Sequence, residues 1–138
     1  MKNESIKIFQ KRKIAVLESW MKFQLADEGL REDLISNEEL RRQSEEFLNA
    51  LIDAMKDSNI DDPKHADFEP MLDILSAIAI SRAKQGFSPR ETGIYIFSLR
   101  DALLNVLQQE MKDPQELFTQ TLKINKLVDS FGVTTFET

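Results

Sequence analysis

Few side chains in this sequence are of the types that perform nucleophilic, acid–base or metal chemistry. The chain has one histidine, His65, and no cysteine. Without cysteine, neither a disulfide, nor a thiolate nucleophile, nor a cysteine-ligated zinc site can form. Carboxylates are plentiful, with 24 Asp and Glu residues, but no Ser or His stands at catalytic spacing from them. The sequence therefore favours a protein that is not an enzyme.

One acidic segment has a partial calcium-binding pattern. Asp57, Asn59 and Asp61 occupy alternate positions, as the ligands of an EF-hand loop do. The pattern then fails, because Asp62 stands where the sharp turn requires glycine and Phe68 stands where a bidentate Glu closes the coordination shell. We expect a solvated acidic loop and no bound metal.

The single histidine is the one conventional candidate for a haem or zinc nitrogen. A haem ligand is expected on an apolar helical face. His65 instead follows Pro63 and Lys64 and precedes Ala66 and Asp67. These neighbours indicate a polar loop, so we expect no cofactor.

Arg100 is the most informative charged residue. On a helix it flanks an apolar face at spacings of three, four and seven residues, formed by Ile96, Phe97, Leu103, Leu104 and Leu107. One interpretation, which we favour, is that its stem lies along this face while the guanidinium reaches water. The other is a partly buried cation that pairs with a carboxylate or with an anionic signal ligand.

Size and charge limit the remaining possibilities. A chain of 138 residues with a net charge of −6 forms one domain by default. Its charges are of mixed sign, without the basic stripe that nucleic-acid binding requires. The N-terminus lacks the apolar core of a signal peptide, and no apolar run approaches the ~20 residues that span a bilayer. We expect a cytoplasmic protein that binds neither nucleic acid nor membrane.

The periodicity of apolar residues predicts an all-α bundle of about five helices. We expect them over residues 4–25, from Ser36 to about 55, from Pro70 to about 85, from 88 to about 111, and from Asp113 onward. The second opens with a capping box, Ser36 with Glu39. The third is apolar on nearly every side, which predicts that it is central and buried all round.

The stretch SRAKQGFSPRET predicts a tight corner between the third and fourth helices. Gly86 stands where the third helix should end in a left-handed residue. Ser88, Pro89 and Glu91 supply an N-cap, a first-turn proline and a capping-box acid for the fourth. Phe87 is placed to tuck beneath the turn as a hydrophobic staple.

Three blocks of residues resemble the RsbT co-antagonist RsbRD N-terminal domain family, which comprises the N-terminal domains of RsbR-type proteins of bacterial stressosomes. They are Trp20, the segment LISNEELRRQSEEFLNAL, and the segment SRAKQGFSPRETGIYIFSLRDALL. The matching positions within the two segments are Ser36, Glu39, Leu40, Gln43, Phe47, Leu48, Arg82, Gly86, Phe87, Ser88, Pro89, Glu91, Thr92, Leu99 and Arg100. The resemblance covers essentially the whole chain, and its motifs are structural rather than catalytic.

The resemblance implies a dimeric sensory or signal-input domain, related to the globin-like input domains that lack haem. In that family a STAS domain follows, builds the stressosome core with a scaffold protein, and holds a switch kinase. Residues 1–138 are then one input domain, and FGVTTFET begins the linker to a STAS domain outside this sequence. The family's phosphorylated threonines lie in the linker and the STAS domain, so none is carried onto Thr134, Thr135 or Thr138.

Two alternatives stay open. The chain could be the input domain of a histidine kinase or another signalling protein, since such domains are interchangeable modules. It could also be a haem-binding or gas-sensing globin-like domain, although the position of His65 counts against this. The sequence does not identify the signal.

A dimer requires apolar surface beyond what the core uses. In the first helix, Ile8 falls off the main apolar stripe. In the last helix, Leu127, Phe131 and Phe136 lead toward the linker. We expect these four residues to contribute to a two-fold interface between the first and last helices.

Overall fold

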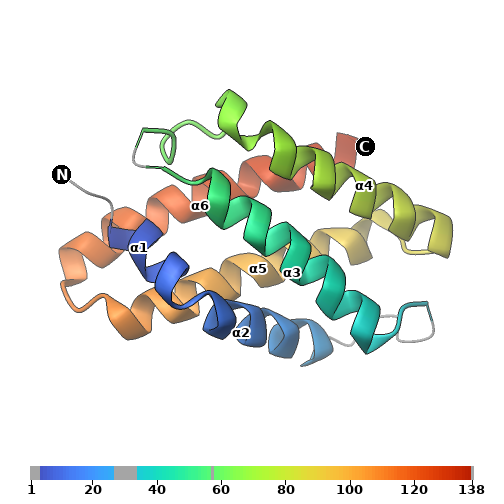
Figure 1. Ribbon diagram of the computed structural model, residues 1–138, viewed down its shortest axis with the longest axis horizontal. Helices are drawn as coiled ribbons and strands as arrows, with labels where there is room; N and C mark the ends of the chain where they lie inside the picture. Colours follow the sequence, from blue (N-terminus) through green and yellow to red (C-terminus); the bar gives the residue numbers. More distant parts are fainter. Residues whose placement is uncertain (1–3, 27–33, 57, 138) are drawn as a thin grey trace.

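The computed structural model describes residues 4–26, 34–56 and 58–137, and this part of the chain is all-α. Its elements are α1 (Glu4–Lys11), α2 (Lys13–Ala26), α3 (Asn37–Ala54), the short 3-10 helix η1 (Ala66–Phe68), α4 (Glu69–Gln85), α5 (Pro89–Glu110) and α6 (Pro114–Glu137) (Figure 1). The described residues contain no strand. The predicted all-α class is confirmed.

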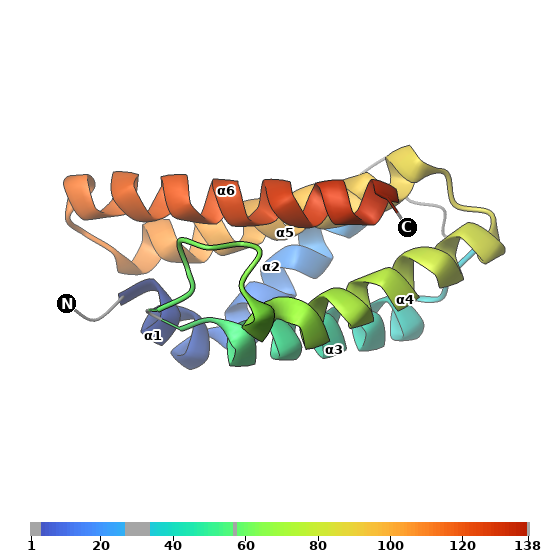
Figure 2. The ribbon, with the colours of Figure 1, turned by 90° about the horizontal axis from the view of Figure 1, so that it is seen from above.

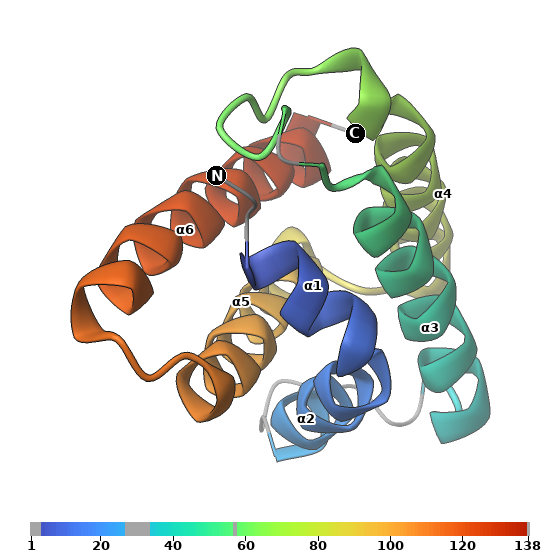
Figure 3. The same ribbon diagram turned by 60° about the vertical axis from the view of Figure 1, so that its left-hand side comes forward.

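The helices form two antiparallel pairs. Helices α3 and α4 lie on one side of the molecule, and α5 and α6 lie on the other (Figure 2). Helices α1 and α2 close one end of the space between the pairs (Figure 3). Helix α5 makes the most extensive contacts, chiefly with α2 and α6. In the described ranges no helix is long and apolar enough to cross a bilayer.

The first predicted helix is in fact two helices that meet at Arg12. The backbone N–H of Arg12 donates to Ile8 O at 2.8 Å, and Val16 N–H donates to Arg12 O at 3.0 Å, so hydrogen bonding continues through the junction. The Arg12 guanidinium lies 3.0 Å from Glu110 at the end of α5. Neither proline nor glycine marks this break, which is why the sequence predicted five helices instead of six.

The corner between α4 and α5 has the predicted geometry. Gly86 adopts φ +106°, a left-handed conformation, and Phe87 N–H donates to Arg82 O at 3.0 Å. Ser88 Oγ accepts from Glu91 N–H at 3.2 Å, and Glu91 Oε1 accepts from Ser88 N–H at 2.9 Å. Phe87 is buried beneath the turn. The left-handed ending, the capping box and the burial of Phe87 are confirmed.

The start of α3 is capped from one side. Ser36 Oγ accepts from Glu39 N–H at 3.1 Å. The Glu39 carboxylate lies 3.7 Å from the Arg42 guanidinium, one turn further along the helix. The predicted N-cap is therefore present, while the acid of the predicted capping box faces a neighbouring cation.

Helix α4 is peripheral, so the prediction that it is central was wrong. Its outward face exposes Asp73, Ala77 and Ile80, and Ile80 is 45% exposed. It packs mainly against α3 and α6. The central helix is α5, whose polar residues lie near its two ends and along one edge, which hid its central position from the apolar pattern.

Aromatic side chains fill the middle of the core. Phe131 of α6 meets Phe47 of α3 edge to face at 6.5 Å between ring centres, and Phe68 of η1 at 6.1 Å. Trp20 of α2 is fully buried, and its indole N–H donates to Tyr95 O at 3.0 Å. These contacts join α6 to α3 and η1, and α2 to α5.

Candidate functional site

Two of the four predicted interface residues lie in the core of the protomer. Leu127 and Phe131 have no exposed surface, because the face of α6 that carries them packs inward. Ile8 is half-buried against the core, and the side chain of Phe136 lies outside the described residues. This corrects the choice of Leu127 and Phe131: an apolar interface on α6 has to use other side chains.

The outward face of α6 supplies such side chains. Phe118, Leu122 and Val133 are 65%, 54% and 58% exposed, and their spacing of 4 and 11 residues places them along one face. Phe97 of α5 is 37% exposed beside Gly132 of α6. We call Phe97, Phe118, Leu122 and Val133 the α6 apolar face.

Arg100 combines the two interpretations of its sequence position. Its Nη1 lies 3.4 Å from Asp129 Oδ1 on α6, and its guanidinium carbon lies 5.3 Å from the centre of the Phe97 ring. The Arg100 side chain is 32% exposed and that of Asp129 is 63% exposed. The partner is thus a surface carboxylate, and a pair so exposed contributes little to stability.

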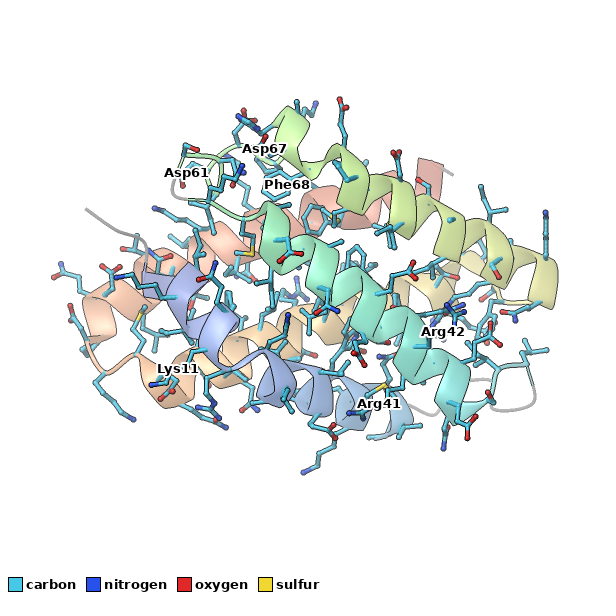
Figure 4. All side chains as sticks on the ribbon, in the orientation of Figure 1. Lys11, Arg41, Arg42, Asp61, Asp67 and Phe68 are labelled. Atoms are coloured by element: carbon cyan, nitrogen blue, oxygen red, sulfur yellow. The ribbon has the colours of Figure 1, made fainter. Side chains whose placement is uncertain are left out.

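The polar side chains between α3 and α4 mostly bind each other. His65 Nδ1 accepts from Asp67 N–H at 3.0 Å and so caps η1. Buried Asn59 donates to Ala54 O at 2.7 Å and to Asp67 Oδ2 at 3.2 Å. Asp61 lies apart in the same segment (Figure 4), 3.5 Å from Lys123 of α6.

These contacts account for the partial calcium pattern as a folded loop. The amide of Asn59 is used within the loop, and Asp57 lies outside the described residues. No group of three or more acidic or histidine side chains in the described ranges is placed to hold a metal ion. His65 serves the start of a short helix in polar surroundings, which does not fit a haem ligand.

A buried polar cluster lies where four helices converge. We call it the Arg82 cluster, and its members are all less than a tenth exposed. They are Gln24 of α2, Gln43 and Ser44 of α3, Arg82 of α4 and Tyr95 of α5. Arg82 is held in place by the corner that follows it, and Tyr95 lies in the second turn of the helix that the corner begins.

Arg82 is a buried cation whose positive charge has few hydrogen-bond partners and no paired carboxylate among the described residues. Its side chain is 1% exposed, and its guanidinium carbon lies 4.0 Å from the Tyr95 ring centre and 5.1 Å from that of Phe87. Its Nη2 donates to Gln43 Oε1 at a long 3.4 Å, and its Nε has no partner. Within the described ranges no carboxylate lies at ion-pair distance from it.

Burial changes the acidity of both groups in this contact. Burial lowers the pKa of Arg82, although electrostatic interactions with Tyr95 and Glu39 act to raise it. Burial also raises the pKa of Tyr95 to about 12, although the Arg82 charge and nearby Ser44 act to lower it. The Ser44 side chain is the polar neighbour of the Tyr95 hydroxyl, although the two do not meet strict hydrogen-bond geometry.

The rest of the cluster is also incompletely bonded. Gln24 Nε2 donates to Ser44 Oγ at 3.3 Å, but Gln24 Oε1 has no partner. Oε1 of Gln85, which lies one turn beyond Arg82, also has no partner. Most buried polar atoms in proteins are hydrogen-bonded, so unpaired ones at a single place require a cause. The arrangement suits the binding of a small polar species rather than bond-breaking chemistry.

The sequence analysis placed Arg82 in the family pattern but did not recognise it as buried. A signal was present. Met71, Leu75, Ile78 and Arg82 follow each other at spacings of 4, 3 and 4, so they occupy one helical face. All four are buried. An arginine that continues an apolar stripe is a candidate for a charge inside the core.

A groove on the surface is a less specific candidate. A surface groove of about 650 Å³ lies between α2 and α3 and is lined by residues including Met21, Leu25 and Lys22. Arg41 of α3 (Figure 4) pairs with Glu18 of α2 across it. The hydrogen bond from Arg41 and its charge lower the pKa of Glu18. The Arg41 charge at this groove is therefore paired with a carboxylate, unlike that of Arg82.

The fold and the Arg82 cluster define an all-α domain with a charged interior and surface-exposed apolar side chains on its last helix. The family model of the RsbT co-antagonist protein RsbRD N-terminal domain matches residues 15–138, and the chain belongs to this family. The resemblance is thus confirmed, and with it a stressosome-related sensory input domain. No curated protein and no solved structure matches the chain.

Proposed function

We propose that this chain is a non-catalytic, cytoplasmic signal-input domain that forms a homodimer and controls a C-terminal STAS domain. Through that STAS domain it modulates the switch kinase of the stressosome. Membership of the RsbRD N-terminal domain family supports the stressosome-related sensory role. The α6 apolar face is the observation that carries the dimer, because it lies on the last helix of the domain.

Pairing of two copies through the α6 apolar face covers its exposed side chains. Phe118, Leu122 and Val133 are each more than half exposed on one face of α6, and exposed large apolar side chains that gather on one face mark an interaction surface. A two-fold axis lets each copy cover the same face of the other. A stable interface of this kind buries on the order of 1,000 Å² or more in total.

Helix α6 is also in contact with the elements that would carry a signal. It packs along α5 and against α4, and near its start Gln120 accepts a hydrogen bond from Ser5 of α1 at 2.7 Å. A change inside the bundle therefore shifts α6. In a dimer, a shift between the paired last helices becomes a shift of the two linkers.

Sedimentation equilibrium tests the dimer. We expect a dimer for the unmodified chain and a monomer for the double variant Phe118→Asp with Leu122→Asp. Ile14→Asp is the matched control, because Ile14 is 75% exposed on α2 and lies outside the α6 apolar face. A monomeric unmodified chain at high micromolar concentration contradicts the dimer. A double variant that stays dimeric places the interface elsewhere.

The control of output is tested in a chain that includes the STAS domain. We expect the Phe118→Asp, Leu122→Asp double variant to change phosphorylation of the STAS domain by the switch kinase, while Ile14→Asp leaves it unchanged. Equal phosphorylation in all three proteins contradicts the proposed route through α6. Finding the coding region of a histidine kinase directly after Thr138 would support the alternative output.

A further inference from the structure

We propose that the Arg82 cluster is a binding site for a small monovalent anion, such as chloride or a short carboxylate. The proposal rests on the buried charge and the unpaired hydrogen-bond donors of the cluster, and it does not depend on the proposed dimer. The anion would bind between the Arg82 guanidinium and the Tyr95 hydroxyl, in the interior of one protomer.

The first argument is the charge. Arg82 is 1% exposed, and a charge removed from water is costly unless an opposite charge accompanies it. Arginine keeps its proton under ordinary conditions, so it cannot escape this cost by becoming neutral. The faces of Tyr95 and Phe87 supply a cation–π attraction, which compensates only part of the loss of water.

The second argument is the type of the unpaired atoms. Arg82 Nε is a donor without a partner in the described structure. The Tyr95 hydroxyl can also donate, and its polar neighbour Ser44 does not meet strict hydrogen-bond geometry with it. Water could accept both bonds but would leave the positive charge in place. An anion accepts both bonds and neutralises the charge as well. The donors Arg82 Nε and Tyr95 hydroxyl, which belong to residues in contact around a buried positive charge, therefore favour an anion over a water molecule.

The third argument is size. The four helices pack directly around the cluster, and Trp20 lies with its ring centre 4.7 Å from that of Tyr95. A ligand at this place is limited to one or a few heavy atoms. Gln24 and Ser44, which are bonded to each other, complete the polar wall, since the Gln24 amide and the Ser44 hydroxyl can both turn a donor toward an anion.

Trp20 makes the proposal measurable. It is the only tryptophan, it has no exposed surface, and it contacts Tyr95. Iodide quenches tryptophan fluorescence on close approach, so it serves as the probe, with sulfate replacing it to hold ionic strength constant. We expect quenching of the unmodified chain to saturate with iodide concentration. Quenching that is absent, or that rises linearly without saturation, overturns the proposal.

Variants assign the quenching to the cluster. We expect Arg82→Met to abolish the saturating component of iodide quenching. Arg100 is a half-buried arginine on α5, so Arg100→Met is the control and should retain that component. Tyr95→Phe keeps the ring but removes one donor, so we expect iodide affinity to fall about tenfold. If Arg82→Met does not fold, as judged by circular dichroism, the Tyr95→Phe result decides. Unchanged affinity in either folded variant overturns the proposal.

Competition identifies the physiological class of anion. Chloride that displaces iodide at lower concentration than formate indicates a halide site, and the reverse order indicates a carboxylate site. Both results support an anion site at Arg82. Iodide that neither chloride nor formate displaces is bound elsewhere, and this result overturns the proposal.

Discussion

The guanidinium carbon of Arg82 lies 4.0 Å from the centre of the Tyr95 ring, inside the core, and no described carboxylate is within ion-pair distance of it. The contact joins the last turn of α4 to the second turn of α5, on either side of the corner at Gly86. It places the one tyrosine of the chain in the field of a buried cation. Because there is only one tyrosine, its spectroscopic signal reports on this contact alone.

Tyr95 should ionise only at very alkaline pH. Burial raises its pKa to about 12, against about 10 for a tyrosine in an unfolded chain. Because Tyr95 is the only tyrosine, tyrosinate absorbance near 295 nm reports on it alone. We expect a midpoint near 12 in the native protein and near 10 in concentrated urea, and a native midpoint near 10 would show that the hydroxyl is hydrated.

The same pKa predicts how stability depends on pH. Below pH 10 both folded and unfolded states keep the tyrosine proton, so its contribution is fully present. Between about 10 and 12 only the unfolded state loses the proton, so the free energy of unfolding falls as pH rises, by about 2–3 kcal/mol in total. Tyr95→Phe, compared by urea unfolding across this range, should lack this part of the decline.

Gly86→Ala should destabilise the protein by about 1–2 kcal/mol, because a side chain is strained in the left-handed conformation. Gly86 has φ +106°, and an added Cβ would lie 3.7 Å from the nearest Leu34 atom, an ordinary contact. The cost therefore comes from the backbone and not from a clash. Urea unfolding measures it, and an unchanged free energy of unfolding would contradict the left-handed ending.

Gly132→Ala should have the opposite sign. Gly132 lies inside α6, and an added Cβ would meet Phe97 at 3.6 Å without a clash. Alanine loses less backbone entropy than glycine in a helix, so we expect a gain of about 0.5–1 kcal/mol. The two glycine variants are controls for each other in one unfolding experiment. A loss of stability in Gly132→Ala would show that α5 and α6 pack more closely at this point.

Arg100→Met should change the free energy of unfolding by less than about 0.5 kcal/mol. Methionine keeps much of the apolar stem against Phe97, and the lost pair with Asp129 is largely exposed. Thermal unfolding at low and at high salt provides the check. A large loss that high salt reduces would mean that the pair matters more than its exposure indicates.

Local signals in the sequence predicted local structure well. The Gly86 ending and the Ser88 and Glu91 capping box depend on residues that are neighbours in the chain, so their types determine the geometry. The all-α class followed from apolar spacing in the same way. The break at Arg12 has no such signal, because neither proline nor glycine stands there.

Features that depend on packing between distant segments were harder to predict. Phe131 and Leu127 are apolar and near the end of the chain, which is compatible with both a core and an interface. Only the position of α6 against α4 and α5 places them inside. Arg82 was missed for a related reason: its type predicts exposure, whereas its stripe with Met71, Leu75 and Ile78 predicts burial.

Arg82 takes part in the corner and in the core at once. Its backbone carbonyl accepts the Phe87 N–H that closes the turn, while its side chain carries the unpaired charge. Unwinding the last turn of α4 therefore breaks the turn and frees the guanidinium to reach water in a single event. The amide hydrogen of Phe87 exchanges with solvent when this turn unwinds. Its exchange rate therefore measures how often the Arg82 side chain becomes accessible to water.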